Sequence, residues 1–294
     1  MPPVRRLVLV VLVAVACGAS VVHAQTLSLT YTSGATYKYS LHSTADEAIT
    51  IGAMATPLKF ELTGSETVTV NSVDSGGIAD LEISLTNLTL KSTTGTVTNT
   101  TTGMPSPAID MKIGPDGRIV SVNGNGSAAF GVFSPAGGGG FISAVLPDNA
   151  VKPGDTWSKD FDQANTLGAG SIHVATNSKY LRDESLQGVN AAVVQTTSTA
   201  TYELTMDVSK FAFGAGSPTP PLPQGMPQSI TVKGTSTSDV TSWIDPAGHR
   251  VIKSRMSGTT DASLNMEAAA GATMPGMPGS FTIKGKETTD ISPA

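Results

Sequence analysis

The fold is decided in the middle of the chain, by the stretch Leu146-Pro147-Asp148-Asn149-Ala150-Val151-Lys152-Pro153-Gly154-Asp155-Thr156-Trp157-Ser158-Lys159-Asp160-Phe161. Proline fixes one backbone angle and glycine accepts a positive φ, so a Pro-Gly-Asp sequence is typical of a tight turn. The stretch follows the glycine run 137–140 and holds one of the chain's 2 tryptophans. We therefore expect one β region to end here and a second to begin.

Alternating apolar residues on both sides of this turn predict β-strands. In the clearest strand they alternate from Leu81 to Leu85, and the phase then slips before Leu88. A β-bulge near 86–87 would return both sets of side chains to the core. A type I turn is expected at 114–117, where Pro and Gly hold the second and fourth positions. Further strands are expected at 27–31 and 37–41, paired as a hairpin, and at 58–62, 68–70, 109–113, 120–122, 172–181, 191–206, 230–244, 249–266 and 281–291.

The composition favours the same fold class. Only 14% of the residues are charged, against roughly 25% in ordinary domains, and Thr, Ser and Gly take their place. Long Thr-rich strands suit a strongly curved antiparallel sheet with one face in water. We therefore predict a mainly β protein with a large curved antiparallel sheet of half-barrel or clam-like form. One or two short helices are expected within 128–146, where apolar residues are too dense for a half-exposed strand.

The chain is expected to form a single β-rich domain, 25–294, with two related halves, 25–150 and 151–294. Gly34-Ala35-Thr36-Tyr37 matches Gly154-Asp155-Thr156-Trp157, and 113–121 matches 244–252 in the same order. An internal duplication would explain these matches. Convergence of β-hairpins on the same turn chemistry would explain them as well, and the sequence leaves both explanations open.

The first 24 residues have the three parts of a secretory signal peptide. Arg5 and Arg6 supply the positive charge, residues 7–16 form an apolar run, and Ala24 offers a small residue before the cut. The apolar run is short for a membrane span. We expect Gln25 to be the first mature residue and the protein to be exported, either to the periplasm or outside the cell.

Cys17 is the only cysteine. It lies inside the expected signal peptide, so the mature chain would have no disulfide and no thiolate site. The alternative is a lipid anchor on Cys17, because Val15-Ala16-Cys17-Gly18 partly matches a lipoprotein motif. Ala14 stands where that motif prefers leucine.

The net charge excludes nucleic acid as a partner. Without residues 1–24 the chain has 16 basic and 23 acidic side chains, a charge of −7. Binding to nucleic acid needs basic side chains that neutralise phosphates. No basic cluster suits an anionic membrane surface either, and we expect a monomer with no transmembrane segment after signal removal.

No motif for catalysis, a cofactor or a metal stands out. The mature histidines, His42, His173 and His249, are far apart and lack a second ligand at metal-binding spacing. Carboxylates at 46–47, 155 and 183–184 are those available to a hydrolase that uses an acid and a base. We interpret them as solvated turn residues and expect no enzyme, no metal site and no cofactor.

Three segments together resemble a known family: Tyr31 with Gly34-Ala35-Thr36-Tyr37-Lys38-Tyr39, the 146–157 core, and Asp245-Pro246-Ala247-Gly248. The chain is similar to an uncharacterised family of secreted bacterial β-rich proteins, a domain of unknown function. This resemblance spans most of the mature chain and implies no active site. The predicted layout also resembles the β-clam of periplasmic lipoprotein carriers, a likeness of architecture only.

Apolar segments outside the strands are the candidate ligand contacts. Three loops contain Met-Pro, and methionine adapts to varied apolar ligands. Ordinary proline-stiffened connections are the alternative. The segment 130–146 is the candidate lid over a concave apolar face, with 137–140 as its hinge. The candidate lid and contact residues are Phe133, Phe141, Val145, Leu146, Met104, Met226, Met274 and Met277.

The sequence thus favours an exported, non-enzymatic protein that binds a lipid or another hydrophobic small molecule on an apolar concave face. The alternative is a structural cell-envelope or adhesion domain with a filled core and no small-molecule ligand. The volume of any cavity under residues 128–146 distinguishes the two hypotheses. A large apolar cavity supports ligand binding, and a packed interior supports the structural domain.

Overall fold

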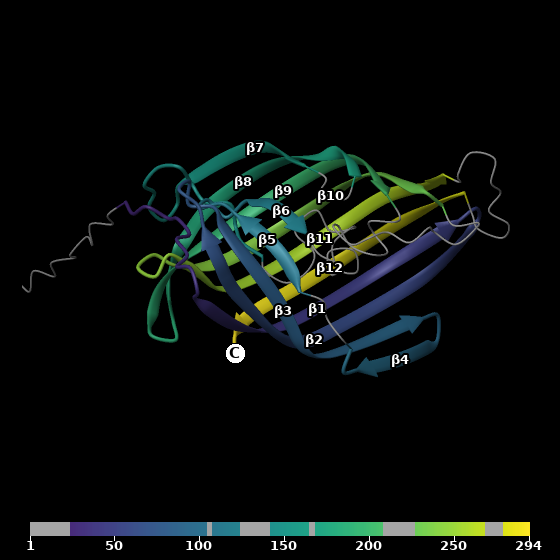
Figure 1. The fold of residues 1–294 in the computed structure, drawn as a ribbon, viewed down its shortest axis with the longest axis horizontal. Coiled ribbons are helices and arrows are strands. Elements are labelled where there is room, and N and C mark those ends of the chain that lie inside the picture. Colours follow the sequence, from purple (N-terminus) through teal and green to yellow (C-terminus); the bar gives the residue numbers. More distant parts are fainter. Residues whose placement is uncertain (1–23, 105–107, 124–141, 165–167, 208–226, 268–278) are drawn as a thin grey trace, which may run out of the picture.

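The computed structural model describes residues 24–104, 108–123, 142–164, 168–207, 227–267 and 279–294. All regular secondary structure within these ranges is β, as the sequence predicts (Figure 1). The strands are β1 (Thr36–Ile51), β2 (Met54–Val73), β3 (Ala79–Thr94), β4 (Val97–Thr102), β5 (Ile109–Ile113), β6 (Ile119–Asn123), β7 (Thr156–Ala164), β8 (Gly168–Leu186), β9 (Val189–Asp207), β10 (Ser229–Asp245), β11 (Arg250–Glu267) and β12 (Ser280–Pro293).

The strands form a single 12-stranded sheet in the order β6-β5-β3-β2-β1-β12-β11-β10-β9-β8-β7, with β4 paired to β3. The pairings within this sheet are antiparallel. The edge strands β6 and β7 approach each other, so the sheet is nearly closed and barrel-like (Figure 1). The predicted fold class is therefore confirmed.

The short helices expected within 128–146 are not seen in its described part, because residues 142–146 have no helical structure. Residues 124–141 lie outside the described ranges. Within the described residues, no helix is long and apolar enough to cross a membrane. The signal peptide expected at 1–24 lies almost entirely outside these ranges.

The turn expected at 152–155 is present and starts β7. The Asp155 amide donates to the Lys152 carbonyl at 3.0 Å, and Gly154 has a φ of 99°. The turn is joined to β8 because the Gly154 amide donates to the Tyr180 carbonyl and the Tyr180 amide donates to the Asp155 carbonyl.

The matching turn before β1 is built in the same way. The Ala35 amide donates to the Thr32 carbonyl at 3.0 Å, and Gly34 has a φ of 83°. The Gly34 amide donates to the Val70 carbonyl of β2, and the Val70 amide donates to the Ala35 carbonyl. The sequence match between these turns is therefore accompanied by the same hydrogen-bond pattern; the division into two halves stays a prediction.

The predicted bulge near 86–87 is confirmed. The pairing of β2 with β3 shifts between Thr63 and Ser65, and Asn87 adopts a φ of 55°. The skipped residue, Gly64, has no room for a side chain, because a Cβ there would lie 2.7 Å from the Leu88 side chain. The shift keeps Leu88 buried on the same side as Leu85.

The hairpin expected between 27–31 and 37–41 is not formed. Residues 25–31 lie outside the sheet's strands, and their backbone bonds to distant turns instead. The Gln25 amide donates to the Val151 carbonyl, the Leu29 amide to that of Pro115, and the Thr30 amide to that of His249. The alternating apolar residues of this segment are buried as expected, but the segment crosses one end of the barrel and is not a strand of the sheet.

The two tryptophans differ in how deeply they are buried. Trp243 is buried, packed with Ile252 and Val193 on the outer face, with the Lys253 ammonium 4.6 Å from its ring centre. Trp157 is only partly buried against the main core, and its indole nitrogen donates to the Val145 carbonyl at 2.9 Å. The fold therefore buries Trp243 more completely than Trp157.

Candidate binding site on the inner face

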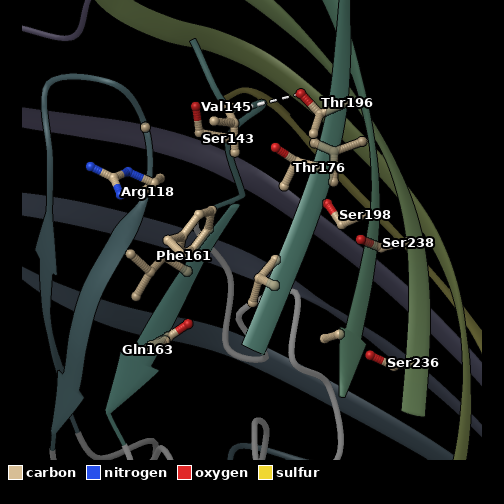
Figure 2. A pocket seen from close by; sticks show the side chains of 15 residues that line it. Arg118, Ser143, Val145, Phe161, Gln163, Thr176, Thr196, Ser198, Ser236 and Ser238 are labelled. Carbon is tan, nitrogen blue, oxygen red and sulfur yellow. Dashed lines mark hydrogen bonds between the residues drawn. The ribbon is translucent and has the colours of Figure 1, made fainter. Parts of the chain in front are cut away.

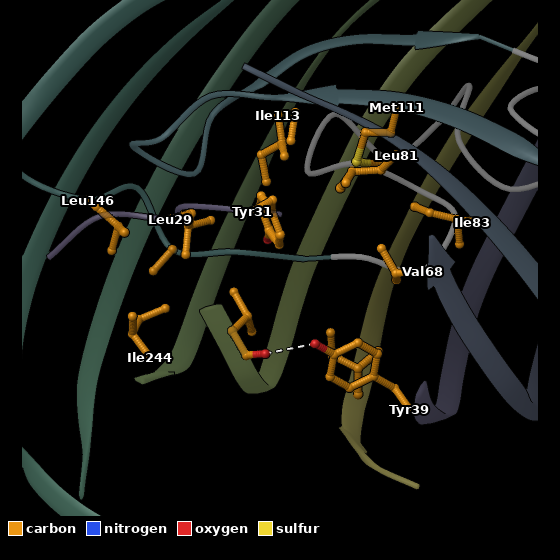
Figure 3. Packing of buried hydrophobic residues seen from close by; sticks show 14 of the residues in the cluster. Leu29, Tyr31, Tyr39, Val68, Leu81, Ile83, Met111, Ile113, Leu146 and Ile244 are labelled. Atoms are coloured by element: carbon orange, nitrogen blue, oxygen red, sulfur yellow. Dashed lines mark hydrogen bonds between the residues drawn. The ribbon is translucent and has the colours of Figure 1, made fainter. Parts of the chain in front are cut away.

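The inner face of the barrel is packed at one end, which we call the plugged end. Its main core joins side chains of the sheet to those of two crossing segments, 25–31 and 142–151, which together form the plug (Figure 3). Leu29 and Leu146 from the plug are almost completely buried. The Tyr39 hydroxyl donates to the Val251 carbonyl at 2.8 Å (Figure 3). This end is a filled core.

Residues 142–146 form a strap across the inner face. The Ala144 amide donates to the Ser242 hydroxyl at 2.8 Å, and the Val145 amide donates to the Thr196 hydroxyl at 3.0 Å. The Leu146 amide donates to the Asp116 carbonyl at 2.8 Å. Because each of these amides has a partner on a different element, the strap is fixed to the sheet rather than loosely laid on it.

A small cavity lies beside the strap, between the turn after β5 and the inner face of β7 to β10 (Figure 2). Its volume is about 60 Å³. It is lined by Gly117, Arg118, Ile119, Ser143, Val145, Phe161, Gln163, Val174, Thr176, Thr196, Ser198, Ala200, Ser236, Ser238 and Val240. This is not the large apolar cavity that the ligand-binding hypothesis expected under the strap.

The hydroxyl groups of the cavity fall into two sets. Those of Ser143, Thr176 and Thr196 are bonded within the protein, to the Ala144 carbonyl at 3.0 Å, the Lys159 carbonyl at 3.0 Å and the Ser178 hydroxyl at 2.7 Å. By contrast, no hydrogen bond joins the hydroxyls of Ser198, Ser236 and Ser238 to any described residue. Within the described part of the chain, these three serines and the Gln163 amide are the polar side chains of the lining that have no hydrogen-bond partner (Figure 2).

The rim carries the only charged side chain that lines the cavity. The Arg118 guanidinium lies 5.0 Å from the ring centre of Phe161 and donates to Asp116 at 2.5 Å. Asp116 also accepts from the Lys159 ammonium at 2.9 Å. Burial acts to raise the pKa of Asp116, but Lys159 and Arg118 outweigh it and hold this pKa below its usual value. The rim charge is therefore already paired.

Beyond the cavity, away from the plug, the inner face becomes apolar again. We call this cluster the far patch: Tyr202, Leu204, Met206, Val232, Ala262, Leu264 and Ile283. Partly buried apolar residues from β1, β8, β10 and β12 adjoin it. The seven residues of the far patch lie on one face of four adjacent strands, β9 to β12, and each is at most 6% exposed, although no other described element packs on them.

Glu66 on β2 is the unusual buried group of the plugged end. Its carboxylate is completely buried, and neither of its oxygens has a hydrogen-bond partner among the described residues. Burial raises its pKa from 4.5 to about 8. Tyr39 is its direct neighbour on β1. A carboxyl group in these surroundings holds its proton at neutral pH.

Three of the candidate contact residues fall in the described ranges. Val145 and Leu146 are buried in the strap, and Val145 lines the cavity. Met104 packs against the main core. The remaining candidates, Phe133, Phe141, Met226, Met274 and Met277, lie outside the described residues, so a role in ligand contact stays a prediction for the whole set.

The groups considered for chemistry are dispersed. His42 lies 3.6 Å from Glu61, His173 lies beside Asp160 and Asp162 on the outer face, and His249 adjoins Ser28. Within the described part of the chain, no three His, Cys, Asp or Glu residues are placed to hold a metal ion.

The carboxylates considered for acid and base roles also serve other contacts. Asp155 accepts from the Lys152 amide in its turn, and Asp46 pairs with Lys59 at 3.0 Å. Asp183 accepts from the Tyr180 hydroxyl, and Glu184 pairs with Arg182. Whether the protein has an enzymatic activity is not tested by these contacts.

The three free serines were missed in the sequence. Their positions carried a usable pattern: Ser236 and Ser238 alternate in phase with Val232 and Val240 on β10, so they must face the same side. Serines on the apolar side of a strand are a sign of a polar site within the inner face. Thr-rich neighbours at the outward positions obscured this pattern.

No family model matches the chain, so the resemblance to a family of secreted β-proteins has no support beyond the segments that suggested it. No curated protein sequence matches either. One solved structure similar to the chain concerns lipid–protein interactions in lipovitellin, with 10% identity and a TM-score of 0.45. The match covers 90% of this chain and 26% of that one. A score this low carries no argument about function.

Proposed function

We propose that the protein is exported, has no enzymatic activity and binds a lipid or another hydrophobic molecule on the inner face of its sheet. One observation carries this proposal: the cavity and the far patch lie along the same strands. On β9, Ser198 and Ala200 line the cavity, and Tyr202 and Leu204 follow in the patch. The inner face therefore has a polar site and an apolar site on the same strands, and we propose that one molecule binds to both.

The far patch is the apolar part of this site. Its side chains belong to adjacent strands of one sheet, and each is at most 6% exposed, so the patch is an apolar environment from which water is excluded. The patch and the plugged end are separated along β10 by Ser236 and Ser238. It is thus a buried cluster distinct from the core of the plugged end.

The alternative is a structural envelope or adhesion domain without a small-molecule ligand. The plugged end favours it, because the plug fills the interior there and leaves a cavity of only about 60 Å³ beside the strap. On this alternative the far patch is also part of a filled core, and the outer face carries the function.

Native mass spectrometry of the protein purified from its own host tests the proposal. A co-purifying hydrophobic molecule is expected for the wild type and is expected to be lost in Leu204→Gln, which places an amide in the far patch. Glu203→Gln is the matched control, because Glu203 lies on the opposite face, paired with Lys233 at 3.1 Å.

If the wild type carries no ligand, and none binds when hydrophobic molecules are added, the structural domain is the better interpretation. If a ligand is retained equally by Leu204→Gln and Glu203→Gln, binding occurs away from the far patch. The same spectra give the mass of the mature chain. A diacylglycerol adduct on Cys17 would show that the protein is lipid-anchored.

A further inference from the structure

We propose that the tip of the β1–β2 hairpin, residues 51–57, docks the barrel on a lipid surface by inserting Ile51 and Met54, and that this contact needs neither anionic lipid nor basic side chains. The inference goes beyond the proposed function, because it requires no molecule inside the barrel. It assigns a role to an exposed apolar segment that the inner-face site does not use.

Exposed apolar side chains gather at one end of the barrel. Among the described residues, the large apolar side chains that are exposed are Met54 at 73%, Val97 at 59%, Val120 at 43% and Ile51 at 42%. Ile51, Met54 and Val97 lie at the tips of the adjacent β1–β2 and β3–β4 hairpins, at the end opposite the plug (Figure 1). Val120 lies apart from them, on β6 beside the plugged end. Apolar residues scattered singly over a surface are ordinary, but a concentration at one end indicates a contact.

The β1–β2 tip is apolar along its whole length. Residues Ile51-Gly52-Ala53-Met54-Ala55-Thr56-Pro57 are all exposed, and Thr56 has the one polar side chain among them. Consecutive exposed apolar residues are avoided in soluble proteins unless they serve a contact. Ile51 and Met54 are direct partners across the turn, so their side chains lie on the same face of the hairpin and form one patch.

Both tips lack charged side chains. Residues 48–58 and 92–109 contain no Asp, Glu, Lys, Arg or His. The charged residues nearest in sequence to the β1–β2 tip are Glu47 and Lys59, and Lys59 is about 16 Å of extended strand from Met54. Lys59 is also paired, with Asp46 at 3.0 Å. A charged side chain is costly to place in apolar surroundings, so a tip without charge can enter a lipid surface, and salt should have little effect on its binding.

The backbone of the tip is suited to shallow insertion. The β1–β2 ladder is continuous up to the pair of Ile51 and Met54, so Gly52 and Ala53 alone form the loop. Gly52 has a φ of 59°, as the first central position of a type II′ turn requires. Polar backbone groups without partners are unfavourable in hydrocarbon, and a two-residue loop leaves few of them.

The two tips differ in reach. Thr94, which pairs with Val97 at the β3–β4 turn, also pairs with Leu58, and Leu58 follows Met54 on β2 by four residues. The β3–β4 tip therefore lies about 13 Å further back along the strands. We expect the β1–β2 tip to lead the insertion and Val97 to contribute little.

A lipid surface fits the β1–β2 tip better than a second protein does. A stable protein interface buries about 800 Å² on each partner and needs matching shapes. The tip is a single hairpin whose strands are about 5 Å apart, too narrow to supply such an area. A lipid surface closes around individual side chains, so Ile51 and Met54 can be buried there without a partner of complementary shape.

Co-sedimentation with phosphatidylcholine vesicles tests the inference. The protein is the expected mature chain, residues 25–294, which contains every described strand and lacks Cys17. Burial of two apolar side chains predicts reversible binding that is half complete at roughly millimolar lipid. Equal binding at low and high salt is expected, because no ion pair with the lipid is involved. Binding that requires anionic vesicles and disappears at high salt would overturn the inference.

Serine substitutions locate the contact. The double variant Ile51→Ser with Met54→Ser is expected to weaken vesicle binding by at least about tenfold. Val120→Ser is the matched control, because Val120 is as exposed as Ile51 but lies beside the plugged end. The control is expected to bind as the wild type does, and melting temperatures check that all the variants remain folded. Equal binding by the double variant and the control would show that the tip is not the contact.

A fluorescent label gives a second measurement, which does not depend on a loss of binding. The expected mature chain has no cysteine, so Met54→Cys and Val120→Cys each accept a single environment-sensitive label. On addition of vesicles, the emission of the label at position 54 is expected to shift to the blue and that at position 120 to stay unchanged. A shift at position 120 alone, or at neither position, would contradict insertion of the tip.

The oligomeric state of the free protein separates a lipid surface from a second copy of the chain. If the wild type ignores vesicles but forms dimers that the double variant does not form, the tip binds a second copy and the lipid surface is wrong. Failure to bind vesicles leaves the proposed function standing, because that function is tested by the ligand found in protein from its own host. Absence of such a ligand likewise leaves the vesicle contact unaffected.

Discussion

The plugged end and the far patch are two apolar regions on the same face of the same sheet, yet only one has a described partner. At the plugged end, Leu29 and Leu146 arrive from segments outside the sheet and complete the core. At the far patch, the described side chains meet only their neighbours on adjacent strands. An alternating apolar pattern therefore predicts which face is buried, but it does not predict what buries it.

The difference also explains why one end is suited to stability and the other to binding. A filled core gains from every methylene and loses when one is removed. A surface that exchanges its cover between water and ligand must remain stable without that cover. The following substitutions test the distinction, from the largest expected effect to the smallest.

Removing a leucine from each end gives the largest contrast. Leu29→Ala is expected to lower the free energy of unfolding by about 3–4 kcal/mol, because Leu29 is 1% exposed inside a packed core. Leu204→Ala is expected to cost less, about 2 kcal/mol, because Leu204 is 6% exposed but packs only against its neighbours on adjacent strands among the described residues. Denaturant unfolding measures both. Equal losses at the two ends would show that the far patch is a filled core and favour the structural domain.

Glu66 makes the plugged end sensitive to pH. Its pKa is raised to about 8 in the folded protein, so it keeps a proton that the unfolded chain releases near pH 4.5. The contribution of the protonated Glu66 is therefore complete below about pH 4.5 and is lost as the pH rises to about 8. The loss approaches about 5 kcal/mol if the rest of the molecule does not adjust.

The variant Glu66→Gln isolates this effect, because glutamine is uncharged at every pH and has nearly the same shape. Unfolding measured from pH 4 to pH 9 is expected to show a smaller decline in stability for Glu66→Gln than for the wild type. Parallel curves for the two proteins would mean that Glu66 is ionised, or paired, within the folded protein at neutral pH.

Substitutions at two glycines separate the effect of the strap contact on stability from the effect of backbone strain alone. Gly117 has a φ of 80°, and a Cβ there would lie 2.5 Å from the Ala144 carbonyl oxygen. Gly154 has a φ of 99° and open space around it. Gly154→Ala is expected to cost about 1 kcal/mol through backbone strain, and Gly117→Ala about 2 kcal/mol or more. If thermal unfolding shows the same loss of stability for both variants, the contact between the strap and the turn at Gly117 does not contribute.

Much of the fold follows from the sequence, because alternation and turn chemistry act locally. The alternation from Leu81 to Leu85, the phase slip at Asn87 and the turn at Gly154 all appear where the pattern places them. Each feature depends on a few neighbouring residues, and each has a single favourable backbone solution.

The features that were missed depend on distant segments. The segment 25–31 has a strand-like pattern, but its partners at Pro115, Val151 and His249 are far away in the sequence. Likewise, Ser198 and Ser238 meet only through the pairing of β9 with β10. The candidate site is therefore visible in the sequence only after the sheet register is known.

Methyl resonances of methionine give the most direct test of where the ligand lies, because the described core of the plugged end and the far patch each contain one buried methionine. Met206 belongs to the far patch, and Met111 belongs to the plugged end. With methyl-labelled methionine, addition of a single-chain lipid to the delipidated protein is expected to shift the Met206 resonance and leave that of Met111 in place. A shift at Met111 alone, or no shift at Met206 under saturating ligand, would contradict binding at the far patch.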